Sequence, residues 1–84
     1  MGKEAIIIKF VNLKNAKEVD LDIPVTMPAN ELVIALNEAY DLEIDISDIK
    51  KCYLRAENPI ALLRGNKTLD EFGLRNGSII YYTK

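Results

Sequence analysis

Apolar and polar positions alternate along the start of the chain, which is the pattern of half-buried strands. Residues 5–11 are dense in isoleucine, valine and phenylalanine, and a period of two places Ile6, Ile8 and Phe10 on one face. After a turn that contains two asparagines, residues 18–23 alternate acidic and apolar side chains, so their apolar members face the same interior. The two segments predict a hairpin.

The period lengthens to that of a helix at residues 29–40. Pro24 and Pro28 stop the second strand because proline cannot donate a ladder hydrogen bond, and Pro28 also suits an early helical position. We expect Thr26 or Asn30 to cap this helix. The apolar stripe that should pack on the hairpin consists of Ala29, Leu32, Val33, Leu36, Ala39 and Tyr40.

Residues 41–49 read "DLEIDISDI" and alternate as regularly as a strand. We interpret this segment as a crossover whose Ile44, Ile46 and Ile49 attach it to the core. Residues 51–56 then predict a third strand, with alternate side chains directed inward and outward.

The last part of the chain is divided by turn residues. Asn58-Pro59 leads into a short fourth strand at 60–63, which Gly65-Asn66 ends. Residues 68–74 read "TLDEFGL" and predict a short helical or 3₁₀ turn, because a glycine follows after about one turn's worth of residues. Asn76-Gly77 then begins a last strand at 78–83.

This order of elements predicts an α+β fold of the β-grasp type. A mixed sheet of about five strands would curl around one helix, with a short 3₁₀ or helical turn before the last strand, and the first and last strands would lie side by side. The chain of 84 residues has room for one such domain, spanning residues 1–84.

Residues 62–82, "LLRGNKTLDEFGLRNGSIIYY", resemble the corresponding part of ubiquitin-like β-grasp proteins. Together with the strand pair that leads to a Met-Pro and an amphipathic helix, the chain is most similar to the bacterial YukD/EsaB family. That family is associated with type VII (WXG100/ESX) secretion in Gram-positive bacteria. The resemblance implies an accessory or regulatory component of that secretion system, with its machinery among the protein partners.

Two other functions fit a small β-grasp chain. One is a non-catalytic subunit of a multicomponent enzyme such as an aromatic monooxygenase. The other is a sulfur carrier or modifier whose Gly-Gly tail is missing, since such proteins activate a flexible C-terminal glycine pair. The sequence printed here ends in Thr83 and Lys84, so we do not expect conjugation if that end is native.

Composition argues against catalysis. The chain has no histidine, and its single cysteine, Cys52, is expected to be a small core residue, so the usual nucleophile and base pairs are missing. Asp41, Glu43 and Asp45 have the spacing of the first calcium-loop ligands, but Ile46 occupies the glycine position of such a loop. We therefore expect no enzyme activity, no cofactor and no metal.

Charge and hydropathy restrict the location and the partners. The first 49 residues hold four lysines and ten acidic residues, whereas the last 35 hold seven basic and three acidic residues. This asymmetry suits contacts with proteins, and the formal net charge of −2 disfavours nucleic acid. No apolar run is long enough for a membrane-spanning helix. We expect a cytoplasmic protein that a partner can bring to the inner face of the membrane.

Strand alternation predicts a binding surface on the outward face of the sheet. If Ile6, Ile8 and Phe10 face the helix, their neighbours face outward, and the β-grasp order brings them next to the outward residues of the third and last strands. The expected apolar centre and its basic rim consist of Ile7, Tyr53, Ile79 and Tyr81, with Lys9 and Arg55 around them.

Overall fold

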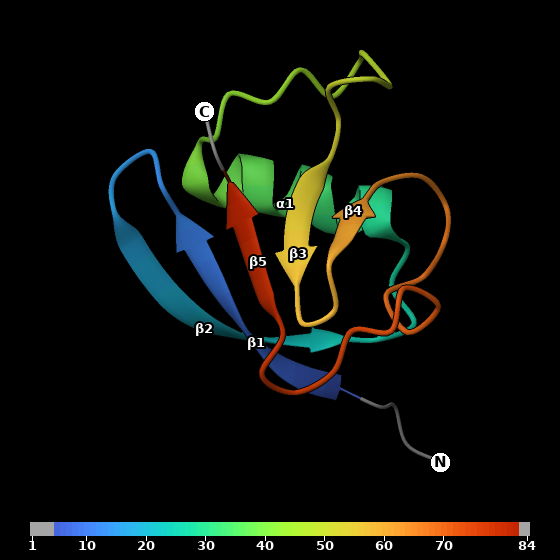
Figure 1. Cartoon of the computed structure of the whole chain (residues 1–84). Coiled ribbons are helices and arrows are strands. Elements are labelled where there is room, and N and C mark those ends of the chain that lie inside the picture. The colour runs from blue at the N-terminus through green and yellow to red at the C-terminus, as the bar shows by residue number, and fades with distance from the viewer. Residues whose placement is uncertain (1–4, 83–84) are drawn as a thin grey trace.

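One helix lies across one face of a mixed five-stranded sheet, as Figure 1 shows, and the fold is the expected α+β β-grasp. The computed structural model describes residues 5–82. Its elements, in chain order, are β1 (Ala5–Asn12), β2 (Lys17–Pro24), α1 (Ala29–Tyr40), β3 (Leu54–Glu57), β4 (Ala61–Leu63) and β5 (Ile79–Tyr82). The predicted last strand extended to Thr83, which lies outside the described residues.

The strand order is β2-β1-β5-β3-β4. β1 and β5 run parallel at the centre of the sheet, with Lys9 opposite Ile79 and Val11 opposite Tyr81. The β1–β2, β3–β4 and β3–β5 pairs are antiparallel. The first and last strands of the chain therefore lie side by side in the middle of the sheet.

The core fills the space between α1 and the sheet, as the alternation predicted. Ile8, Phe10 and Ile80 have 1%, 1% and 0% of their surface exposed, and Val33 from the helix has 0%. The Phe10 and Tyr40 rings pack with their centroids 5.2 Å apart. Burial of apolar surface of this kind is the main favourable contribution to folding.

The predicted side-chain cap of α1 is wrong. Pro28 occupies the N-cap position and no side chain caps the helix. The backbone carbonyls of Lys67 and Gly65 instead accept hydrogen bonds from the amides of Ala29 and Asn30, each at 2.9 Å. A distant loop thus supplies the acceptors that the first turn of a helix needs, so no side-chain oxygen is required there.

The crossover is held differently from the prediction. Leu42 is fully buried and Ile44 is half-buried, but Ile46 and Ile49 are 46% and 79% exposed. The alternation fails because the backbone turns: Asp41 has a left-handed φ of 54°, and residues 45–52 form hydrogen-bonded turns. For the same reason β3 begins at Leu54, later than predicted.

The segment between β4 and β5 forms a short 3₁₀ turn and packs against the core. Amides of residues 71–73 donate to carbonyls three residues earlier, which is the hydrogen bonding of a 3₁₀ turn, as predicted. Leu69 and Leu74 are buried there. The hydroxyl of Ser78, which is fully buried, donates to the Asn58 carbonyl oxygen at 2.6 Å and accepts from the Arg75 amide at 3.0 Å. Ser78 therefore fixes the start of β5 against the β3–β4 turn.

Leu36 offers a direct test of the packed helix face, because its side chain is only 5% exposed. We expect Leu36→Ala to lower the free energy of unfolding by about 2–5 kcal/mol, since it removes buried methyl groups and leaves a cavity. Ile34 lies on the same helix but is 39% exposed, so Ile34→Ala is the matched control and should cost less than ~1 kcal/mol. Urea unfolding followed by circular dichroism gives both values; equal losses would contradict the assigned face.

Candidate functional site

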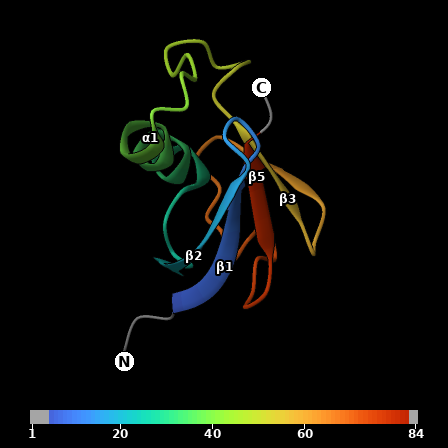
Figure 2. The ribbon, with the colours of Figure 1, turned by 90° about the vertical axis from the view of Figure 1, so that its left-hand side faces the viewer.

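The face of the sheet opposite α1 is the candidate site, and we call it the open face. Figure 2 shows the helix on one side of the sheet and none on the other, and α1 is the only helix among residues 5–82. Side chains that alternate with the buried ones point toward this face. Among them are all six predicted surface residues: Ile7, Lys9, Tyr53, Arg55, Ile79 and Tyr81.

The register arranges these residues in rows across the strands. Lys9 is opposite Ile79, which is opposite Glu57 on β3. In the next row Tyr81 is opposite Arg55, which is opposite Leu62 on β4. Tyr81 thus lies at the middle of the sheet, with a charged residue directly beside it.

The predicted residues do not form one compact cluster. Ile7 lies two residues before Lys9, and Tyr53 lies four residues before Glu57, which belongs to the same row as Lys9. Six residue steps along the strands separate the two ends, a span of about 20 Å. Ile7 lines one hollow with Lys9 and Ile79, whereas Tyr53 lines another with Arg55 and Tyr81.

The alternation argument missed three exposed apolar residues that belong to this surface. Leu13, Leu62 and Ile60 are 53%, 42% and 88% exposed, and they line a hollow of about 510 Å³ with Tyr81 and Arg55. Leu62 had a usable signal, since it alternates with the buried Leu63. Leu13 lies in a turn, where alternation assigns no face. Ile60 was predicted to begin the strand at 60–63, but the structure places it in the turn before β4.

The charges on the open face do not form a simple basic rim. Lys9 is on β1, an inner strand of the sheet, and not at its edge. Its ammonium group forms an ion pair with the Glu18 carboxylate of β2 at 3.5 Å. Asp20 and Asp22 continue an acidic row along the same strand, opposite Lys9 and Ile7. The open face therefore has an acidic edge at β2. Arg55, which forms no ion pair with any of residues 5–82, lies across the sheet on β3.

Tyr81 is electrostatically coupled to its neighbours. A hydrogen bond to the Glu57 carboxylate, together with partial burial and the negative charge of Glu57, raises the pKa of the Tyr81 phenol, and Arg55 opposes this effect. The phenol is therefore kept as a neutral hydrogen-bond donor.

The residues considered for chemistry have structural roles. Cys52 is buried, and burial raises the pKa of its thiol, which disfavours the reactive thiolate. The Asp45 carboxylate accepts hydrogen bonds from the amide and the hydroxyl of Ser47, at 3.1 and 2.6 Å. In the part of the chain that the structure describes, no group of three or more acidic or cysteine side chains is placed to hold a metal.

The fold and its unpartnered face define a ubiquitin-like domain. Its sheet order and single helix are shared with solved ubiquitin-like structures across nearly the whole chain. The chain belongs to the YukD family, described as "WXG100 protein secretion system (Wss), protein YukD", whose model matches residues 6–81. No curated protein matches the sequence.

Solved structures with this fold come from proteins of different kinds. The C-terminal ubiquitin-like domain of mouse tubulin-specific chaperone e has 12% identity and a TM-score of 0.72, with 100% of this chain and 92% of that one covered. The ubiquitin-like domain of tubulin-binding cofactor B has 16% identity and a TM-score of 0.74, over 95% and 89%. Caldiarchaeum subterraneum ubiquitin has 12% identity and a TM-score of 0.63, over 96% of both chains. These likenesses establish the fold.

The coupling of Tyr81 to Glu57 predicts a measurable change in ionisation. Glu57→Gln removes the carboxylate charge that opposes phenolate formation, so the pKa of Tyr81 should fall toward its ordinary value. NMR titration of tyrosine ring carbons at alkaline pH, assigned with Tyr81→Phe, measures it. Asp22→Asn removes a charge elsewhere on the face and is the control. An unchanged Tyr81 titration in Glu57→Gln would contradict the coupling.

Proposed function

We propose that this protein is a non-catalytic, non-conjugated adaptor of the WXG100 secretion system, which acts in the cytoplasm by binding a protein partner through the open face. Membership of the YukD family supports the secretion role. Among the described residues, no helix is long and apolar enough to cross a membrane. A partner would therefore bring the protein to the membrane.

The observation that carries this proposal is the set of exposed apolar and aromatic side chains along the open face. Ile7, Leu13 and Leu62 are all more than 40% exposed, and Tyr53 is 36% exposed. Scattered exposed apolar residues are ordinary, but several gathered on one face indicate an interaction site. Tyrosine and arginine at its centre are the residue types that most often dominate binding energy.

A binding role also agrees with the chemistry of the chain. It contains no histidine, and its one cysteine is buried. The hollows of the open face are open to solvent and mostly apolar, and side chains of the sheet and its turns line them. Such surfaces suit a protein segment better than an enclosed small molecule.

Substitution of Tyr81 tests the role of the face in secretion. A deletion strain complemented with wild-type protein should export WXG100 proteins into the medium, and the Tyr81→Ala protein should restore export poorly. Loss of a central aromatic anchor commonly costs about 2 kcal/mol, or roughly 30-fold in affinity. Ile7→Ala should weaken binding to the partner by a similar factor, whereas Lys9→Ala should change mainly the association rate and its salt dependence.

The control is Ile34→Ala, which shortens an exposed isoleucine on the helix, away from the open face. Immunoblots of cells and medium measure export, and circular dichroism shows that each variant is folded. Normal export with folded Tyr81→Ala and Ile7→Ala proteins would rule out the open face. Normal export in the deletion strain itself would rule out the secretion role.

A further inference from the structure

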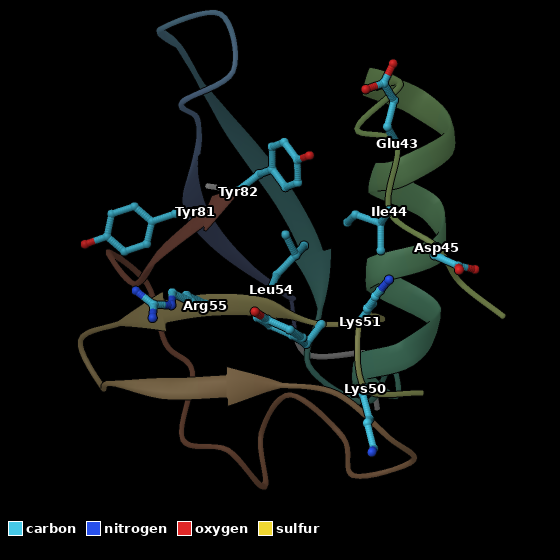
Figure 3. Close-up of a pocket in the computed structure, with 10 residues that line it drawn as sticks. Glu43, Ile44, Asp45, Lys50, Lys51, Leu54, Arg55, Tyr81 and Tyr82 are labelled. Carbon is cyan, nitrogen blue, oxygen red and sulfur yellow. The ribbon is translucent and has the colours of Figure 1, made fainter. Parts of the chain in front are cut away.

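A hollow of about 440 Å³ lies where the crossover meets the ends of β3 and β5. Figure 3 shows Arg55 and Tyr81 on one side of it and Lys50 and Lys51 on the crossover side. Tyr53 also lines the hollow. Three cationic side chains, three phenols and two carboxylates thus line one opening, although they come from distant parts of the chain.

The carboxylates at this hollow are already engaged. Glu43 forms an ion pair with Lys14 at 3.5 Å. Hydrogen bonds from Ser47, with a smaller contribution from the charge of Lys51, hold the pKa of the Asp45 carboxyl below its usual value. By contrast, Lys50, Lys51 and Arg55 form no ion pair among residues 5–82. Within the described part of the chain, the three cations at the hollow are therefore left without an ion-pair partner.

Local hydrogen bonds fix the backbone that carries the two lysines. The Lys50 amide donates to the Asp48 carboxylate at 3.0 Å, and the amides of Lys51 and Cys52 donate to the Asp48 carbonyl oxygen at 2.9 and 3.0 Å. A side chain that bonds to the backbone two residues on stabilises a turn. The turn that carries both lysines is therefore already formed beside β3 before any ligand binds.

The cationic hollow adjoins the apolar one. Arg55 and Tyr81 line both, and beyond them lie Leu13, Leu62 and Ile60. A ligand that crosses Tyr81 would meet leucine and isoleucine side chains on one side and lysines on the other. The surface is thus complementary to a segment with an apolar part and an acidic part.

We propose that the partner is recognised by an acidic amphipathic segment, whose apolar side chains pack on Leu13 and Leu62 while its carboxylates pair with Lys50, Lys51 and Arg55. This inference rests on the proposed function of the open face and specifies the chemistry of its ligand. A nucleic acid would supply anions too, but the acidic row of Glu18, Asp20 and Asp22 at β2 would repel its backbone. A protein segment, by contrast, can carry its negative charges at one end and thus keep them away from the acidic row at β2.

The test uses a short synthetic peptide with leucine and phenylalanine at one end and aspartate and glutamate at the other. Titration into ¹⁵N-labelled protein should shift amides at residues 50–55 and around Leu13, Leu62 and Tyr81. A peptide with asparagine and glutamine in place of the acids should bind at least about tenfold more weakly, and salt should weaken the acidic peptide.

Matched charge reversals locate the contact. Lys50→Glu with Lys51→Glu should weaken the acidic peptide by about tenfold or more, since two attractions become repulsions. The control is Lys17→Glu with Arg64→Glu, because these two cations lie outside both hollows and form no ion pair among residues 5–82. Equal affinity for the acidic and amide peptides, or equal shifts with inorganic phosphate, would overturn the proposal. Chemical-shift changes confined to α1 would also overturn it. So would sedimentation that shows a concentration-dependent dimer of the protein, if the Lys50 and Lys51 reversals abolish that dimer, because the hollow would then bind a second copy of this chain.

Export separates this inference from the proposed function. The Lys50→Glu, Lys51→Glu protein should fail to restore WXG100 export in the deletion strain. If it restores export while Tyr81→Ala does not, the open face still binds the partner and only the acidic segment is rejected. If both restore export, the proposed function fails as well.

Discussion

The parallel pairing of β1 with β5 is the constraint on which the other features depend. It joins the first and last strands at the centre of the sheet, and it places Ile8, Phe10 and Ile80 together under α1. Parallel neighbours need a crossover connection between them, so the chain must run through the helix and the β3–β4 hairpin before it returns. The Ile7 carbonyl accepts from the Gly77 amide at 3.0 Å, and the Ile7 amide donates to the Asn76 side chain at 2.8 Å, which fixes the register of the returning strand.

That register also determines the open face. Every residue that β5 buries has a neighbour that points outward, so burial of Ile80 and Tyr82 places Ile79 and Tyr81 opposite the helix. The core is thus formed by one side of these strands, and the proposed binding surface lies on the other side. A change of one residue in the β1–β5 register would exchange the two sets and lose both the core and the surface.

The acceptors for the helix N-terminus show how loops are tied to this arrangement. Carbonyl oxygens of Gly65 and Lys67 satisfy the amides of Asn30 and Ala29, and the amides of Leu69 and Asp70 donate back to Met27 and Val25. The segment that precedes β5 is therefore bonded to the start of α1. This reciprocal bonding explains why a helix that begins after proline needs no side-chain cap.

The sequence by itself determined the order of the elements, the inward side of each strand and the class of fold. It also determined the inward side of the helix, apart from Ala39, which is exposed. It could do so because apolar periodicity and turn residues act within a few residues of one another. It also assigned Tyr81, Ile79 and Arg55 to the outward face. Only the tertiary structure decided which outward residues share a hollow. Leu13 and Leu62 line one with Tyr81 because of the strand order, and Lys50 and Lys51 line another with Arg55 because the crossover turns instead of alternating. Contacts of this kind depend on register and on backbone hydrogen bonds between distant segments, which no local pattern encodes.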